Sequence, residues 1–224
     1  MTVKPDYEIT PDELKTSYKL SILILTHKRP ELFKRCVNSI LYQKDLEDVE
    51  ILVTSDNYDI TYIRPDIIKY WHNTFYKSQT PLTDKYRFLI EHAHGEYVYF
   101  LEDDDFLTIN GLSKLLTECS KGNDLILGKF FNDENEGYNQ RISRIQKQDD
   151  EDEFQLGQVL WKRSLFKDFD WNNEFKTDDI KNDWILLNKI KNIHNCNIYK
   201  STFIFFKQTY NGDNISVPMN IKHF

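Results

Sequence analysis

Two apolar runs rich in β-forming residues flank an amphipathic segment near the start of the chain, and this pattern constrains the fold more than any other. Residues 19–27 read KLSILILTH and residues 49–56 read VEILVTSD. Both are continuous apolar runs, as strands covered on both faces require. Between them, residues 29–43 place apolar side chains at helical spacing, and Pro30 suits the first turn of a helix. A strand, a helix and a strand within about forty residues predict a β-α-β unit with parallel strands.

The rest of the chain continues the alternation of helices and strands. The predicted elements are a helix over 84–95 stopped by Gly95, a strand over 96–102, a helix over 109–120, a strand over 124–131, apolar structure over 154–166, a helix over 178–192 and a strand over 197–208. Residues 1–18 read as a polar lead-in with a helical turn at 10–14, and the charge-rich residues 132–153 read as an exposed loop. The pattern predicts a three-layer α/β/α sandwich with a mostly parallel central sheet.

Composition narrows the class of protein. The 224 residues are 40% hydrophobic, enough for one sizeable core, so we expect a single domain over 1–224. The formal charge of −7 argues against non-specific binding to nucleic acid. Three widely spaced cysteines indicate reduced, mostly buried thiols in a reducing compartment. The N-terminal residues lack a signal-peptide pattern, and no apolar run approaches the roughly 20 residues of a membrane-spanning helix. These features predict a soluble, cytoplasmic protein.

Four acids follow the strand predicted over 96–102. The stretch YVYFLEDDDFL, residues 97–107, begins as a buried strand and ends in Glu102, Asp103, Asp104 and Asp105. In an open α/β sheet, ligands bind beyond the carboxyl ends of the strands. Clustered carboxylates there can hold Mg²⁺ or Mn²⁺, which prefer oxygen ligands. The alternative is a solvated acidic turn, and the preceding buried strand favours the metal site.

Three segments in order resemble the family-2 glycosyltransferases with the A-type fold. They are SILILTHKRPELFKRCVNSILYQ, VEILVTSDN and AHGEYVYFLEDDDFL, the last resembling the stretch that ends in the D-x-D signature. The resemblance covers residues 19–107 well and 154–192 more weakly. It implies a Rossmann-like sheet, with a nucleotide-sugar-binding half over 19–107 and an acceptor-binding half and C-terminal tail over 108–224. It also implies transfer of a sugar from a nucleotide-sugar, usually a uridine diphosphate sugar, to an acceptor hydroxyl.

The resemblance implies roles in donor binding. Asp56, or its neighbour Ser55, matches the residue that hydrogen-bonds the uracil ring, and a turn-forming Asp is the alternative. Thr26 matches a residue beside the base, or is an ordinary turn hydroxyl, and His27 lies in the same turn. Lys85 and Arg87 match basic residues that face the diphosphate; their alternative is a solvated helix face, and we favour Arg87 because guanidinium fits phosphate in a bidentate way.

The resemblance also implies a metal site in the signature. Asp104 matches the second acid of the signature and is the leading ligand for Mn²⁺ or Mg²⁺. Glu102 stands where the first Asp is usual, so its longer side chain moves the carboxylate or calls for a bridging water. Asp103 is expected to contact ribose or metal, and Asp105 to support the ligands or face the acceptor.

A general base is implied by NDWILLNKI, which resembles the family's Glu-Asp-Trp segment at the head of a late helix. Asp183 matches the catalytic Asp, and the mechanism is then a single displacement with inversion. The alternatives are ordinary charge–dipole chemistry at a helix start, or the acids at 178–179. The family often places a His late in the chain; the matching residues 206–216 have none, and Gln208 or Tyr210 stands nearest.

The acceptor and two other functions stay open at this point. A glycan or lipopolysaccharide-type hydroxyl is the default acceptor, and a hydroxymethylated base in viral DNA is the less favoured one because of the charge of −7. A nucleotidyltransferase would also use acids and Mg²⁺, but its glycine-rich loop is missing from THKRPEL. A catalytically inactive nucleotide-sugar-binding module is the third alternative.

Overall fold

The computed structural model describes residues 7–9, 17–27, 29–56, 67–72, 82–132, 156–171 and 182–208. The strands are β1 (Tyr7–Ile9), β2 (Tyr18–His27), β3 (Val49–Asp56), β4 (Ile68–His72), β5 (Gly95–Phe100), β6 (Phe106–Leu107), β7 (Leu125–Asn132), β8 (Val159–Lys162) and β9 (Ile198–Gln208). The α-helices are α1 (Pro30–Leu41), α2 (Leu82–His92), α3 (Gly111–Cys119) and α6 (Asn182–His194). Short 3₁₀ turns are η1 (Leu46–Asp48), η3 (Leu156–Gln158) and η4 (Arg163–Phe166). The helical turn predicted at 10–14 and nearly all of the loop predicted over 132–153 lie outside the described residues.

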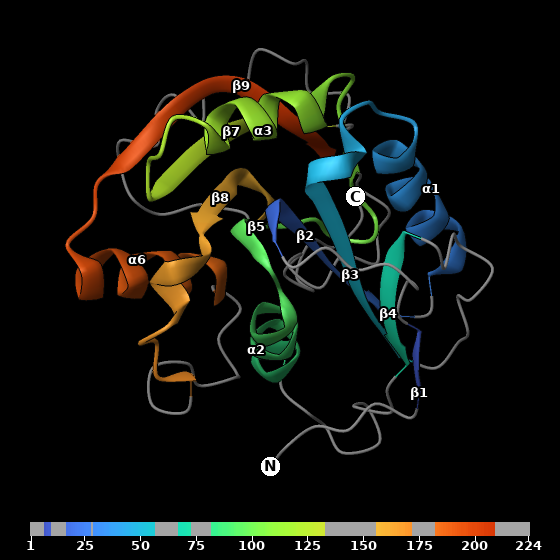
Figure 1. Cartoon of the computed structure of the whole chain (residues 1–224), viewed down its shortest axis with the longest axis horizontal. Coiled ribbons are helices and arrows are strands. Elements are labelled where there is room, and N and C mark those ends of the chain that lie inside the picture. Colours follow the sequence, from blue (N-terminus) through green and yellow to red (C-terminus); the bar gives the residue numbers. More distant parts are fainter. Residues whose placement is uncertain are drawn as a thin grey trace, which may run out of the picture.

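All nine strands belong to one sheet with the order β1-β4-β3-β2-β5-β8-β7-β9-β6 (Figure 1). β2 pairs in parallel with β3 and with β5, and β3 pairs in parallel with β4. β8 is antiparallel to both β5 and β7, so β7 and its parallel neighbour β9 run in the same direction as β2. Six strands therefore point one way, and only β1, β8 and β6 oppose them. The prediction of a mostly parallel sheet is confirmed.

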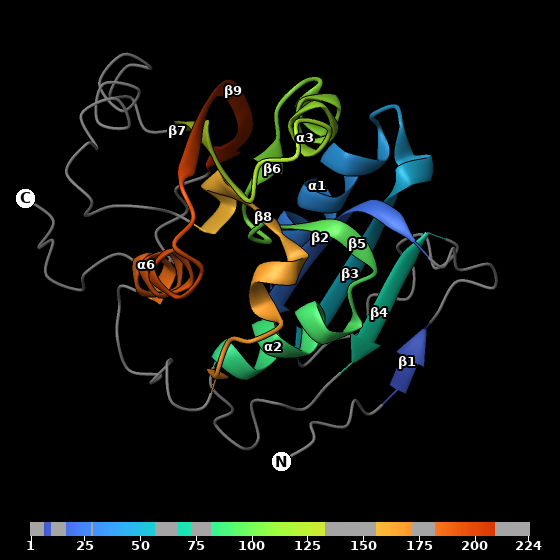
Figure 2. The ribbon, with the colours of Figure 1, turned by 60° about the vertical axis from the view of Figure 1, so that its left-hand side comes forward.

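Helices cover both faces of this sheet, because alternate side chains of the central strands point to opposite faces. On β2, Leu20, Ile22 and Ile24 pack with α1 and α3, whereas Leu23 packs with α2 and α6. β5 shows the same alternation, with Tyr97 and Tyr99 on the first face and Val98 on the second. Figure 2 shows α1 and α3 on the side of the sheet opposite α2. The predicted three-layer sandwich is thus confirmed.

The largest departures from the sequence prediction lie at one margin of the sheet. Neither β1 nor β4 is predicted by the sequence pattern, because three and five residues carry too little periodicity to be recognised. Both become strands through pairing, since β4 aligns with β3 and β1 then adds to β4.

Within the described residues, no helix has the length and apolar character needed to cross a bilayer.

The end of α2 also differs from the prediction. Gly95 does not end the helix; α2 ends at His92, and Gly95 is the first residue of β5. A Cβ added at Gly95 would lie 2.5 Å from both the backbone nitrogen and Oγ of Ser21. Glycine is required here because β5 starts in close contact with β2, so the residue serves strand pairing rather than a helix cap.

Candidate active site

Three strand ends meet at the carboxyl edge of the sheet. In the β2–β3 register, Thr26 lies opposite Ser55 and His27 lies opposite Asp56. The backbone nitrogen of Leu101 donates a hydrogen bond of 3.0 Å to the carbonyl of Leu23, which carries the chain beyond β5 alongside β2. The residues predicted from three separate stretches of sequence are therefore neighbours, as the parallel pairing requires.

Residues 102–105 form a tight turn directly after β5. The backbone nitrogen of Asp105 donates to the carbonyl of Glu102 at 3.0 Å, which closes the turn. Glu102, Asp104 and Asp105 each offer one carboxylate oxygen, and these oxygens lie within 4.8 Å of one another. Glu102 is exposed, whereas Asp104 and Asp105 are buried. A hard divalent cation prefers oxygen ligands of this kind, so the donor set fits Mn²⁺ or Mg²⁺.

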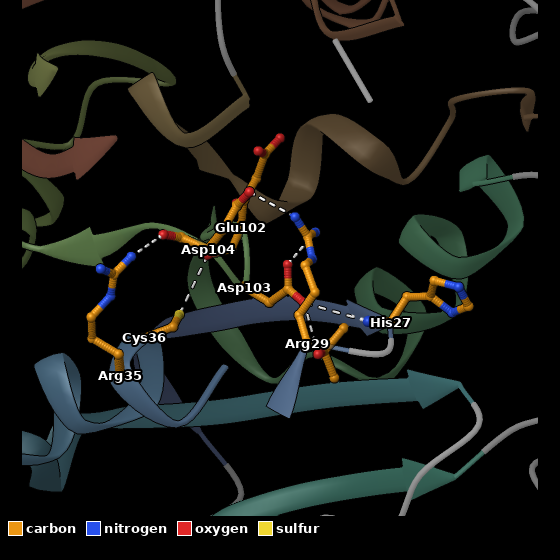
Figure 3. Close-up of polar contacts among 8 residues, drawn as sticks. His27, Arg29, Arg35, Cys36, Glu102, Asp103 and Asp104 are labelled. Atoms are coloured by element: carbon orange, nitrogen blue, oxygen red, sulfur yellow. Dashed lines mark hydrogen bonds and ion pairs between the residues drawn. The ribbon is translucent and has the colours of Figure 1, made fainter. Parts of the chain in front are cut away.

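The side chain of Asp103 points away from that of Glu102 and towards the turn after β2 (Figure 3). Its Oδ2 accepts hydrogen bonds from Thr26 Oγ1 at 2.8 Å and from the backbone nitrogen of His27 at 3.4 Å. Its Oδ1 accepts a hydrogen bond from Arg29 Nη2. Burial raises the pKa of Asp103 to about 6, although Arg29 and the Thr26 hydrogen bond work in the opposite direction. Asp103 thus connects residues 102–105, called the signature turn below, to the β2–α1 turn over residues 26–29.

Arg29 spans two of the acids. Besides Asp103, its Nη1 donates to Oδ2 of Asp104 at 2.7 Å. Burial disfavours the charged guanidinium, but the attraction of Asp103, Asp104 and Glu102 outweighs this and raises the pKa of Arg29. Arg29 therefore stays charged beside the turn. Sequence reasoning gave it no role, although the Arg-Pro pair after the first strand was a visible signal.

Comparison with known proteins gives the family. The model of the family described as "Glycosyl transferase family 2" matches residues 21–196. The chain belongs to glycosyl transferase family 2. A relative from Campylobacter jejuni (subsp. jejuni serotype O:2), the GalNAc(5)-diNAcBac-PP-undecaprenol beta-1,3-glucosyltransferase, is 28% identical over 194 residues. That alignment covers 79% of this chain and 62% of the relative, so this chain spans less than two thirds of that protein.

Solved structures of glycosyltransferases share the fold of this family-2 chain. S. aureus TarS 1-349 in complex with UDP-GlcNAc superposes with a TM-score of 0.66 at 16% identity, covering 88% of this chain and 60% of that one. Mannosyltransferase PcManGT from Pyrobaculum calidifontis, in complex with GDP-Man and Mn²⁺, gives a TM-score of 0.63 at 14% identity. The match covers 97% of this chain and 61% of that one. The predicted A-type glycosyltransferase fold is confirmed by these matches.

In this family-2 chain, helix α1 supports the signature turn from below. Arg35 Nη2 donates to the backbone carbonyl of Asp104 at 2.7 Å, and Cys36 Sγ lies 3.4 Å from the carbonyl of Glu102. Burial, together with the nearby Asp103, raises the pKa of the Cys36 thiol well above its ordinary value. Cys36 is therefore a buried thiol that packs under the turn. The sequence predicted a reduced, buried thiol here but gave it no place beside the acidic turn.

The two basic residues predicted to face the diphosphate lie on α2, which packs against β2 and β3. Lys85 is buried. Arg87 lies within 3.3 Å of Asp84 and 3.8 Å of Glu91, both on the same helix. These contacts hold Arg87 along the helix, and its predicted role at a diphosphate stays a prediction.

Other predicted residues are placed only by their backbone. Asp56 is the last residue of β3, and Asp183 is the second residue of α6. Gln208 ends β9. The side chains of all three, and the whole of Tyr210, lie outside the described part of the chain. Their roles therefore remain predictions.

Proposed function

We propose that this chain is an inverting, metal-dependent glycosyltransferase that moves a sugar from a nucleotide-sugar, preferably a UDP-sugar, to an acceptor hydroxyl. The observation that carries this proposal is the turn after β5, where Glu102, Asp104 and Asp105 bring carboxylate oxygens within 4.8 Å of one another at the carboxyl edge of the sheet. The fold is shared with TarS in complex with UDP-GlcNAc and with PcManGT in complex with GDP-Man and Mn²⁺. Family membership and the acidic turn support the same function.

The proposed metal ligands are Asp104 and Glu102, with Asp105 beside them. A bound Mn²⁺ or Mg²⁺ would stabilise the negative charge that develops on the departing diphosphate. The turn itself brings the ligands together, so little chain entropy is lost when the ion binds. The contacts of Asp103 favour a revised role for that residue: both of its oxygens accept bonds from the 26–29 turn, so we assign it to holding this turn in place.

The donor would lie along the neighbouring strand ends. The proposed contacts of the nucleotide base are Thr26 and His27 at the end of β2 and Ser55 and Asp56 at the end of β3, which the β2–β3 register places opposite one another. Lys85 and Arg87 supply positive charge on α2 for the diphosphate. Residues 19–107 then form the nucleotide-sugar half, and residues 108–224 form the acceptor half.

Asp183 is the proposed general base. Its carboxylate takes the proton of the acceptor hydroxyl while the hydroxyl oxygen bonds to the anomeric carbon and the bond from that carbon to the diphosphate breaks. Attack from the face opposite the leaving group inverts the anomeric configuration.

The proposed acceptor is a glycan hydroxyl. The relative from C. jejuni is named for an undecaprenol-diphosphate-linked glycan, so a lipid-linked oligosaccharide is the first acceptor to test. The relatives and structures described above give no support to a DNA acceptor. The nucleotidyltransferase alternative loses support because the family match points to glycosyl transfer.

A donor screen by calorimetry tests the proposal. The protein would be titrated with UDP, UDP-glucose, UDP-GlcNAc and GDP-mannose, in Mn²⁺ and in EDTA, with Asp104→Ala as the control. Binding of one nucleotide-sugar that needs both Mn²⁺ and Asp104, followed by slow donor hydrolysis, is the expected result. Exchange of pyrophosphate into a nucleoside triphosphate would instead show a nucleotidyltransferase. Binding without turnover in the presence of acceptor would show an inactive module.

A further inference from the structure

The guanidinium of Arg29 lies between two carboxylates, that of Asp103 and that of the proposed metal ligand Asp104. Arg29 donates from Nη2 to Asp103 and from Nη1 to Oδ2 of Asp104 at 2.7 Å. The side chains of Asp103 and Asp104 are 1% and 2% exposed, and that of Arg29 is 26% exposed. Both ion pairs are therefore shielded from water, where an interaction between charges is stronger than at the surface.

The carboxylate of Asp104 would consequently contact two cations, the guanidinium of Arg29 and a bound metal ion. Its carboxylate is one of the three whose oxygens lie within 4.8 Å of one another, and it is also the acceptor for Arg29. A divalent cation bound by that cluster would lie near the guanidinium, because both contact the same carboxylate. Two like charges at such a separation repel each other, and the repulsion lowers the affinity of the turn for the ion.

The same contact has an opposite effect on the protein without an ion. Acids that are adjacent in the chain destabilise one another when they are buried. Arg29 neutralises part of that charge and fixes two carboxylates through a rigid fork of donors. The turn can therefore fold before any ion arrives.

We propose that Arg29 is a positioning residue that shares Asp104 with the divalent cation and thereby sets the affinity of the turn for that ion. This inference rests on the metal site of the proposed function. With Arg29 in place, the metal site is formed before the ion arrives but binds the ion more weakly. Removing the guanidinium therefore lowers the stability of the ion-free protein and tightens ion binding.

Arg35 provides a matched control on the neighbouring helix. Its guanidinium also lies beside the turn, but its hydrogen bond goes to the backbone carbonyl of Asp104 at 2.7 Å. Arg35→Gln therefore removes one positive charge near the site and leaves the bond between Arg29 and the Asp104 carboxylate in place. If sharing of the carboxylate matters, the two glutamine variants will differ.

The experiment is a calorimetric Mn²⁺ titration of wild type, Arg29→Gln and Arg35→Gln, with melting temperatures in EDTA and in Mn²⁺. Arg29→Gln is expected to bind Mn²⁺ about tenfold more tightly than wild type and to gain more melting temperature from it, while Arg35→Gln changes affinity less than about threefold. Arg29→Lys keeps the charge but cannot span both carboxylates, and is expected to fall between wild type and Arg29→Gln. Equal or weaker binding by Arg29→Gln, or equal tightening by both glutamine variants, would overturn the inference.

Three further variants keep the result interpretable. If Arg29→Gln does not fold, Arg29→Gln/Asp103→Asn removes the ion pair as a unit, and its Mn²⁺ affinity is compared with that of Asp103→Asn. Asp104→Asn reports on the metal site itself. If Asp104→Asn abolishes Mn²⁺ binding and Arg29→Gln leaves it unchanged, the proposed role of Arg29 is wrong while the proposed metal site stands. Absence of Mn²⁺ binding by every protein would sink the proposed metal site as well.

Discussion

Buried carboxylates lie at both ends of β2, β3 and β5, and their surroundings differ. At the amino edge, Glu50 stands alone and accepts several bonds: from Ser21 Oγ at 2.5 Å, from the backbone nitrogen of His94 at 2.5 Å and from that of Gly95 at 3.1 Å. At the carboxyl edge, four acids follow one another, and one guanidinium is divided between two of them.

The difference separates a structural carboxylate from the acids of the proposed metal site. Glu50 receives its donors from the strands and the α2–β5 connection that it joins, as a buried carboxylate in a stable fold should. The signature turn instead gathers carboxylate oxygens towards one another, which costs free energy that a bound cation would offset. Four predictions, given from the largest expected effect to the smallest, test whether the two edges differ in this way.

Removing the amino-edge carboxylate should cost the most. Glu50→Ala leaves the donors of Ser21 and His94 without their buried acceptor, whereas the backbone nitrogen of Gly95 keeps its hydrogen bond of 2.8 Å to Ser21 Oγ. We expect a loss of about 3 kcal/mol in the free energy of unfolding. Urea denaturation measures it. Glu96→Ala is the control, because Glu96 forms a surface ion pair with Lys19 at 2.7 Å and such pairs contribute about 0 to 1 kcal/mol. Equal losses in the two variants would contradict a structural role for Glu50.

Removing a carboxylate at the carboxyl edge should cost activity instead. Asp104→Asn weakens the ion pair with Arg29 but relieves the repulsion between adjacent acids, and because these effects oppose each other we expect stability within about 1 kcal/mol of wild type in EDTA. Sugar transfer should fall by about 100-fold or more, equivalent to about 2.7 kcal/mol in the activation barrier. Thermal unfolding and a donor hydrolysis assay measure the two effects. A large loss of stability with activity retained would reverse the roles of the two edges.

The close contact between β5 and β2 at the amino edge should be intolerant of a methyl group. Gly95→Ala places a Cβ 2.5 Å from the backbone nitrogen of Ser21, which cannot move without breaking strand pairing, and we expect a loss of about 2 kcal/mol. Gly122→Ala is the matched variant: it has φ of +78° and open space, so only backbone strain of about 1 kcal/mol applies. Equal costs would show that β5 can shift away from β2.

The smallest expected effect is on the labelling rates of two buried thiols, which report on local opening of the structure at each edge of the sheet. Cys36 lies under the signature turn, whereas Cys119 lies near Lys19 and Glu96 at the amino edge. Burial raises the pKa of Cys119 to about 12 and that of Cys36 well above its ordinary value, so neither reacts until the structure opens. In a Cys196→Ser background, Mn²⁺ at twice its Kd should slow labelling of Cys36 by about threefold and leave Cys119 unchanged. Equal slowing of both thiols would show that opening is global.

Much of the fold could be predicted because its signal is local. The long apolar runs of β2 and β3 and the stripe of α1 repeat at fixed spacing, and a β-α-β unit has one favoured topology. β4 could not be predicted in the same way, because IKYWH becomes a strand only through its pairing with β3. β8 was read as apolar structure without a direction, and its antiparallel pairing with β5 and β7 is a tertiary outcome.

The candidate site was predicted in position but not in detail. The sequence alone determined that acids follow a buried strand at the carboxyl edge of a parallel sheet, because chain order and strand direction put them there. Tertiary packing makes Asp103 face the β2–α1 turn while Glu102, Asp104 and Asp105 face one another. The fold also brings Arg29, which lies 74 positions before Asp103 in the chain, between Asp103 and Asp104. These contacts could not be predicted because a tight turn sends successive side chains in different directions, and the partner that each one meets depends on what the fold brings alongside.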